Sequence, residues 1–353
     1  MTVTKEAVAT ALSAFALPGG GTPVSRDLVR ALAVEGGVVR FVLEAPTPDE
    51  ARALEAVRPA IEAAIRAMPG VVSVSVLTTA PGPGPKSGPK IGGHPTPQAG
   101  PQPVPGVARV LLVGSGKGGV GKSTVASNLA VALARAGRRV GLLDADIHGP
   151  SQPRMMGVSK RPASPDGHMI VPVEAHGLKL MSLGLMLKPD EAVIWRGPML
   201  MGAMQQMLFQ VAWGDLDVLV IDLPPGTGDV QLTLAQKTVL TGALVVSTPQ
   251  DVALIDARRA IDMFVRLKVP VLGLIENMST YVCPNCGHEA HPFGHGGVAT
   301  EAGRLGLPFL GELPLDLSVR LAGDAGTPIA AGDGPAAEAY ARLAARLVGD
   351  GMA

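Results

Sequence analysis

The chain has 353 residues, which is more than one ordinary compact domain contains. Its composition of 47% hydrophobic and 17% charged residues is sufficient for a folded core and excludes a disordered chain. Its 30 basic and 30 acidic residues cancel, which excludes a basic field over the whole protein for gripping nucleic acid. No apolar run approaches the roughly 18 residues of a membrane-spanning helix, so we expect a soluble protein with neither nucleic acid nor membrane among its partners.

Residues 1–80 have the pattern of a small α+β domain. The apolar stretch at residues 7–17 has one basic flanking residue, Lys5, which is typical of an amphipathic helix rather than a secretion signal, so we expect a cytoplasmic protein. Hydrophobic periodicity then predicts a short helix, a strand, a longer helix and a second strand, at residues 25–33, 37–43, 49–68 and 71–77. The domain has no cluster of titratable residues, which favours a docking role.

Residues 81–106 differ sharply in composition from what precedes them. Nine prolines and seven glycines occupy these positions, without apolar periodicity. Such a segment buries too little apolar surface to offset the entropy of ordering it. The composition therefore predicts a linker rather than a fixed internal loop.

Residues 107–353 alternate between short apolar runs and helical stretches. The predicted strands are β-branched, as buried parallel strands require, and lie at residues 110–113, 140–143, 218–221, 244–246 and 271–275. The clearest helices between them are at residues 123–136 and 254–267. This alternation predicts an α/β domain with a doubly wound, mostly parallel sheet, whose ligands bind beyond the carboxyl ends of the strands.

A glycine-rich loop follows the first of these strands and leads into a helix, which is the context of a phosphate-binding loop. Its backbone N–H groups and the helix N-terminus favour anionic oxygens. Lys122 is placed to neutralise the β and γ phosphates, and Ser123 to offer its hydroxyl to magnesium. A glycine-rich turn without function is the alternative. The predicted nucleotide-binding residues are Gly116, Lys117, Gly118, Gly119, Val120, Gly121, Lys122, Ser123 and Thr124.

Acidic and amide residues follow later strands of the predicted sheet. Asp144 and Asp146 end the second strand, and Asp222 ends the third. Carboxylates at this edge can order an attacking water or a magnesium-bound water, although each alone would more often cap a helix. Asn277 and Pro314 follow the last strands, where a base would lie, and the Asn277 amide can read the edge of adenine.

The two cysteines of the chain, Cys283 and Cys286, are separated by two residues. One such pair supplies two thiolates, whereas a tetrahedral metal site or an iron–sulfur cluster usually needs four. Two copies related by a two-fold axis would supply the missing pair. The alternative is zinc completed by His288, His291 or His295, but this spacing is cramped for a zinc finger. Thiolate-only ligation favours the bridging cluster, and a catalytic disulfide fits least well.

Four motifs together resemble the Mrp/ApbC/Nbp35 family of iron–sulfur cluster carrier ATPases. They are Gly-Lys-Gly-Gly-Val-Gly-Lys-Ser-Thr at 116–124, Asp-Ala-Asp-Ile-His-Gly-Pro-Ser at 144–151, Asp-Leu-Pro-Pro-Gly-Thr-Gly-Asp at 222–229 and Cys-Pro-Asn-Cys at 283–286. The resemblance covers about residues 107–350. It implies a homodimeric ATPase that binds ATP and Mg²⁺, holds a [4Fe–4S] cluster between subunits through the paired cysteines, and passes it to apoproteins.

The resemblance also implies roles for single residues. The second lysine of the loop, Lys117, resembles that of the deviant phosphate loop of MinD, ParA, ArsA and the nitrogenase iron protein, and would act catalytically on the nucleotide of the partner subunit. By the same resemblance Lys122 and Asp146 are catalytic, with Asp146 positioning the attacking water, and Asp222 holds magnesium through water. Residues 1–80 are similar to the MIP18-like domain often fused ahead of this ATPase, although their motif after the first helix departs from the family pattern. That similarity implies docking to targets or to a cluster-assembly scaffold.

Two other functions remain as alternatives. A MinD- or ParA-like positioning protein would use the same nucleotide switch on membrane or DNA, with the cysteines holding structural zinc. An ATP-driven electron donor like the nitrogenase iron protein would also bridge a cluster, but its cysteines are far apart in sequence. The close spacing of Cys283 and Cys286 favours the carrier.

Overall fold

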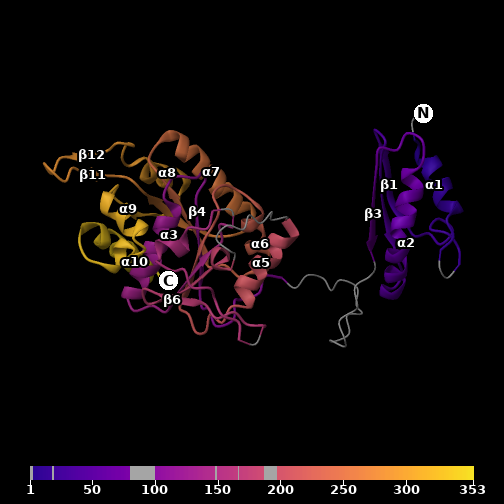
Figure 1. The fold of residues 1–353 in the computed structure, drawn as a ribbon. Coiled ribbons are helices and arrows are strands. Elements are labelled where there is room, and N and C mark those ends of the chain that lie inside the picture. The colour runs from indigo at the N-terminus through magenta and orange to yellow at the C-terminus, as the bar shows by residue number, and fades with distance from the viewer. Residues whose placement is uncertain (1–2, 18–19, 80–99, 148, 166, 187–196) are drawn as a thin grey trace. The chain divides into compact units, whose positions relative to one another are not determined.

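The computed structural model describes the chain except for residues 1–2, 18–19, 80–99, 148, 166 and 187–196. It divides into two compact units, Met1–Pro95 and Thr96–Ala353, which are described separately (Figure 1). Most of the predicted linker, residues 81–99, lies outside the described residues, as does His148 of the second motif.

The small unit is a three-stranded sheet with two helices. Strand β2 (Val38–Glu44) is central, antiparallel to β1 (Val29–Glu35) and parallel to β3 (Ser73–Thr79). Helices α1 (Lys5–Ala14) and α2 (Pro48–Arg66) share one apolar core with the sheet. The predicted first and longer helices and both predicted strands are confirmed, and their ends differ from the expected ones by one to three residues.

The short helix predicted at residues 25–33 is wrong, because most of this stretch forms strand β1. Leu28 is buried, and Val29 pairs with Leu43 across the antiparallel ladder. The register shifts between Arg30 and Ala33, where Ala31 has a positive φ of 50°. Backbone pairing with β2 therefore overrides the local helical pattern, and the bulge hides the two-residue alternation of a strand.

The large unit contains an eight-stranded sheet in the order β13-β10-β9-β4-β8-β5-β7-β6. Neighbouring strands are parallel, except that β6 is antiparallel to β7. The predicted strands correspond to β4 (Val110–Gly114), β5 (Val140–Asp144), β8 (Val218–Asp222), β9 (Gly242–Ser247) and β10 (Val271–Glu276). The remaining strands are β6 (Val173–Ala175), β7 (Leu178–Ser182) and β13 (Phe309–Glu312).

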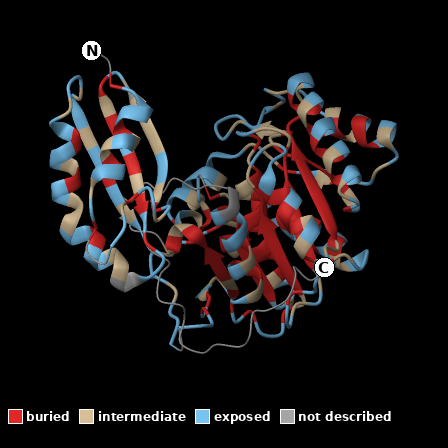
Figure 2. Cartoon of the chain, turned by 90° about the vertical axis from the view of Figure 1, so that its right-hand side faces the viewer, coloured by how far each residue is buried: buried red, intermediate tan, exposed pale blue. Residues whose placement is uncertain are grey.

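Helices cover both faces of this sheet, so the predicted doubly wound fold is confirmed. In β4, Leu111 and Val113 contribute to the core beneath α3 (Lys122–Arg135) and α10 (Pro335–Gly349), whereas Leu112 contributes to the core on the opposite face. The strands are buried on both sides (Figure 2). The opposite face is covered by α5 (Gly197–Phe209), α6 (Asp229–Lys237), α7 (Asp251–Arg266) and α8 (Gly297–Leu305).

The end of the predicted linker packs onto the large unit. Val104 is 2% exposed and belongs to its core, and the Gln102 N–H donates to Lys237 O at 2.9 Å. Residues 102–106 therefore differ from the expected linker, because one apolar side chain and three main-chain hydrogen bonds to the rest of the unit offset the cost of ordering them. Among the described helices, none is long and apolar enough to cross a membrane.

Candidate functional site

The glycine-rich loop joins β4 to α3 at the carboxyl edge of the sheet. Gly121, the residue before α3, has a left-handed φ of 80° and no side chain that could cap the helix. The first N–H groups of α3 therefore have no side-chain partner from the cap position and can bind an anion. Gly116 is needed for packing, because a Cβ there would overlap the main chain of Asp256 in α7. The loop lines a cavity of about 370 Å³, to which Lys117, the stretch 118–124 and Asp146 contribute.

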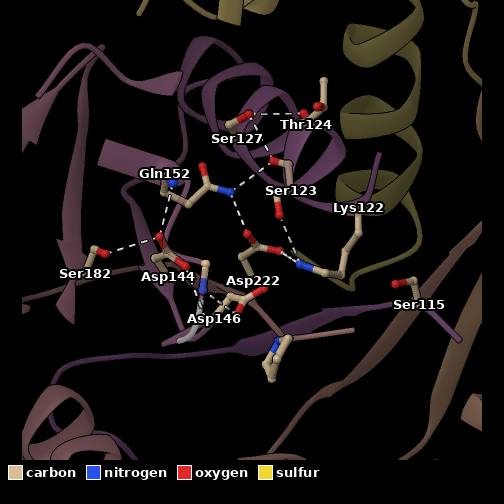
Figure 3. A network of polar contacts seen from close by, with 12 residues as sticks. Ser115, Lys122, Ser123, Thr124, Ser127, Asp144, Asp146, Gln152, Ser182 and Asp222 are labelled. Carbon is tan, nitrogen blue, oxygen red and sulfur yellow. Dashed lines mark hydrogen bonds and ion pairs between the residues drawn. The ribbon is translucent and has the colours of Figure 1, made fainter. Parts of the chain in front are cut away.

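A buried ion pair lies at the floor of this loop. Lys122 is 6% exposed and Asp222 is 0% exposed. The Lys122 Nζ donates to Oδ1 of Asp222 and, at 3.1 Å, to Oγ of Ser123 (Figure 3). The three side chains predicted to handle phosphate and magnesium therefore meet at one point, although 100 residues separate Lys122 from Asp222. The buried carboxylate is charge-balanced by the lysine.

The two carboxylates at the carboxyl end of β5 occupy different environments. Asp144 is 1% exposed, and its oxygens accept from Asp146 N (3.2 Å), Gln152 N (3.1 Å) and Ser182 Oγ (3.1 Å). Burial, followed by the nearby charge of Asp222, raises the pKa of Asp144 to about 7. Asp146 instead lines the phosphate cavity. Asp144 therefore stabilises the conformation of the segment after β5 through its hydrogen bonds, and Asp146 is the carboxylate that can contact a ligand.

The raised pKa of Asp144 predicts a pH-dependent stability. The folded protein keeps the Asp144 proton up to about pH 7, whereas the unfolded chain releases it near 3.8. Its contribution to the free energy of unfolding should therefore fall by about 1.4 kcal/mol per pH unit as the pH rises through this window, and level off above it. Urea unfolding at several pH values checks this. The slope should be smaller in Asp144→Asn, and equal slopes in the two proteins would contradict the assignment.

A second cavity of about 340 Å³ adjoins the loop, with Gly121 and Thr124 in the walls of both cavities. Asn277 and Pro314 line it, as does Arg320 of α9 (Leu317–Asp324). The Asn277 Nδ2 donates to Val120 O at 2.9 Å, and a Cβ on Gly121 would overlap this amide. The Asn277 Oδ1 has no hydrogen-bond partner within the described parts of the chain. The amide thus holds the loop with one atom and leaves its oxygen for a ligand.

Sequence patterns did not indicate two residues of this network. Gln152 begins the four-residue helix α4 (Gln152–Met155), and Ser182 ends β7. Both donate to Asp144, and Gln152 also reaches Asp222. The sequence offered one indication of Gln152, which directly follows the motif at residues 144–151. Ser182 carried no signal, because its strand was not predicted.

The two cysteines lie on a hairpin formed by β11 (Tyr281–Val282) and β12 (Glu289–Ala290), and they line neither cavity. The hairpin extends from one end of the large unit (Figure 1). Cys283 N donates to His288 O at 2.9 Å, and Gly287, with φ 68°, closes the turn onto Cys283 O. The N–H groups of Asn285 and Cys286 point at the Cys283 sulfur and lower the pKa of that thiol. Both thiols are free and Cys286 is exposed, so the turn presents two sulfur atoms that a metal can reach and favours the thiolate form of Cys283.

The neighbouring histidines contact other groups. His291 Nδ1 lies 2.9 Å from Ser279 O, and His295 Nε2 lies 3.0 Å from Oε2 of Glu312. Among the described residues, the one group of three side chains placed to hold a metal is Glu276, His295 and Glu312, which contains neither cysteine. A zinc site that combines both thiols with these histidines within one chain therefore finds no support in this geometry.

Comparisons with known proteins identify the family of the chain. Residues 106–348 match the family model described as NUBPL iron-transfer P-loop NTPase, and residues 5–76 match the model described as iron-sulfur cluster assembly protein. The chain is 44% identical over 326 residues to the iron-sulfur cluster carrier protein of Synechocystis, covering 91% of this chain and 89% of the relative. The corresponding protein of Pseudomonas fragi is 51% identical over 248 residues, covering 68% and 86%.

Solved structures show the same nucleotide-binding fold. A nucleotide-binding protein of Archaeoglobus fulgidus in complex with ADP is 41% identical, with a TM-score of 0.56, and the match covers 62% of this chain and 87% of that one. The MinC:MinD complex of Aquifex aeolicus matches with a TM-score of 0.52 at 23% identity, covering 69% and 96%. The second likeness supports the fold alone.

Proposed function

The chain belongs to the family of NUBPL iron-transfer P-loop NTPases, and from this premise we propose that it is an ATP-hydrolysing carrier of a [4Fe–4S] cluster that two copies hold between them and pass to apoproteins. One observation carries the proposal: a phosphate-binding loop and an exposed turn with two free thiols belong to the same unit. The first binds and hydrolyses nucleotide, and the second binds the cargo.

The arrangement around Lys122 supports a magnesium nucleotide. The Lys122 ammonium lies between Ser123 Oγ and Asp222 Oδ1, so the position between these two oxygens suits a positive charge. Mg²⁺ is a cation that the same two oxygens could hold once Lys122 engages phosphate. Ser123 and Asp222 would hold Mg²⁺, which neutralises phosphate charge when bound. Lys122 then neutralises the β and γ phosphates, and Asp146 orients the attacking water from the cavity wall. Asn277 and Pro314 contact the base in the adjoining cavity.

Lys117 has a separate role in the proposed dimer. It lies in the wall of the phosphate cavity, and no hydrogen bond or ion pair engages its ammonium among the residues that the structure describes. We propose that it stabilises the phosphate charge on the nucleotide of the partner subunit. The two active sites would then be complete only in the dimer, which couples hydrolysis to the interface that holds the cluster.

The cargo is held by Cys283 and Cys286 of both subunits. Two thiolates per chain leave a cubane cluster half ligated, and a two-fold axis supplies the other two. The lowered pKa of Cys283 increases the fraction of this residue that is thiolate, the form that binds iron. The small unit, which matches the cluster-assembly family model, is proposed to dock apo iron–sulfur proteins or the cluster-assembly scaffold. The reducing cytoplasm, where thiols stay free, is the compartment that suits this chemistry.

Cluster transfer tests the proposal. Protein reconstituted anaerobically with ferrous iron and sulfide is mixed with an apo dehydratase whose activity depends on a [4Fe–4S] cluster. Dehydratase activity should return even when a chelator for free iron is present, because the cluster passes directly between proteins. Equal amounts of iron and sulfide without the carrier are the control. Recovery that is no greater with the carrier than in this control would contradict the proposal.

A further inference from the structure

Gln152 links three parts of the nucleotide site from a position that is 0% exposed. Its main-chain N–H donates to Oδ2 of Asp144 at 3.1 Å. Its side-chain Nε2 donates to Oδ2 of Asp222 at 2.8 Å and to Ser123 O at 3.0 Å (Figure 3). One residue therefore connects the carboxylate that ends β5 to the carboxylate that ends β8 and to the first turn of α3.

The contacts fix the orientation of the Gln152 amide. Its Nε2 faces two acceptors, so exchanging Nε2 and Oε1 would place an oxygen against two other oxygens. The Oε1 is buried and has no partner in the described structure. Leaving a buried oxygen unpaired is unfavourable, and the two hydrogen bonds that Nε2 donates to Asp222 and Ser123 offset this cost. Gln152 thus serves as a donor.

Asp222 has two side-chain partners among the described residues, one for each oxygen. Lys122 donates to Oδ1 and Gln152 donates to Oδ2. If Lys122 turns to the phosphates of a bound nucleotide, Gln152 is the donor that remains on a fully buried carboxylate. A buried carboxylate that has lost one of its two donors needs the other to keep its orientation.

We propose that Gln152 is a positioning residue for magnesium: it holds Oδ2 of Asp222 so that Oδ1 stays directed at the magnesium position when Lys122 engages phosphate. This inference rests on the proposed nucleotide function. Gln152 does not line the phosphate cavity, so it acts through Asp222 rather than on the nucleotide. Because it follows Asp146 by six residues, it also fixes the loop that carries the water-positioning carboxylate relative to the metal.

The test is the effect of magnesium on nucleotide affinity. Gln152→Met keeps the length of the side chain and the main-chain N–H but removes the amide. The affinity for ADP is measured by calorimetry with Mg²⁺ and with a chelator in its place. Without Mg²⁺ the variant should bind ADP within about twofold of the original protein, because the phosphate loop is intact. The tightening caused by Mg²⁺ should be about tenfold smaller, equivalent to about 1.4 kcal/mol.

Two further variants make the result decisive. Gln206→Met, an exposed position on α5, is the matched control and should leave both affinities unchanged. In an Asp222→Asn background, Gln152→Met should cause little additional loss, because the residue acts through Asp222. Should the methionine variant fail to fold, Gln152→Ala should show the same loss.

Three results would overturn the inference. A full Mg²⁺ effect in Gln152→Met, or an additive loss in the double variant, would remove Gln152 from the metal site while leaving the proposed function intact. Absence of any Mg²⁺ effect in the original protein would overturn both this inference and the proposed nucleotide function.

Discussion

Replacing Lys122 with alanine is expected to lower ATP hydrolysis by about a thousandfold, because the change removes the cation that balances the β and γ phosphates. Within the described residues, no other cation is as near to Ser123 and Asp222. The variant also leaves Asp222 buried without its ion-pair partner, which should lower the free energy of unfolding by about 3 kcal/mol. Phosphate release and urea unfolding are therefore measured on the same preparation.

Two matched variants separate binding from hydrolysis. Lys117→Ala removes the other lysine of the same loop and should keep nucleotide affinity while hydrolysis falls. Asp146→Asn should also bind ATP but turn it over slowly, because an amide does not polarise water as a carboxylate does. Hydrolysis by Lys122→Ala at the rate of the original protein would contradict the assignment of this lysine to the phosphates.

Replacing either cysteine with serine is expected to abolish cluster binding while leaving ATP hydrolysis in place. A hydroxyl is a poor substitute for a thiolate, and with Cys283→Ser or Cys286→Ser each dimer offers two thiolates instead of four. Nucleotide hydrolysis should persist because the turn belongs to neither core and lines neither nucleotide cavity. Iron and sulfide content after anaerobic reconstitution, measured beside phosphate release, checks both halves of this prediction.

The control lies between the two cysteines. Asn285→Ala keeps the main-chain N–H that points at the Cys283 sulfur and should retain the cluster. A full cluster in either serine variant would mean that other groups complete its ligation, and the proposed four-thiolate site would then be wrong.

The parts of the fold that follow from local pattern were predictable from the sequence. β4, β5 and β8 are buried throughout, so uninterrupted apolar runs mark them, and the glycine-rich loop is identified by its own residues. Strand β1 was predicted as a helix because its bulge disrupts alternation, and only pairing with β2 reveals it. Strands β6 and β7, the last two at one side of the sheet, are short or irregular in pattern and gave no signal.

The candidate site was predictable as a set of residues but not as a network. Strand-end positions were enough to place Asp146 and Asp222 at one edge of the sheet. The pairing of Lys122 with Asp222, and the link through Gln152, join segments that lie 70 to 100 residues apart. Such contacts depend on strand order and register. The turn of His291 and His295 toward Ser279 and Glu312 likewise depends on tertiary packing, and the sequence left these histidines open as zinc ligands.

The central claim is that two chains hold one cluster between them, and the mass of the intact complex tests it most directly. Reconstituted protein is transferred anaerobically into a mass spectrometer under conditions that preserve noncovalent assemblies. The account predicts a dimer whose mass exceeds that of two chains by one cubane of four irons and four sulfides. Protein that has not been reconstituted should contain little of this species. A monomer that carries one zinc ion, or a dimer with a separate metal on each chain, would contradict it.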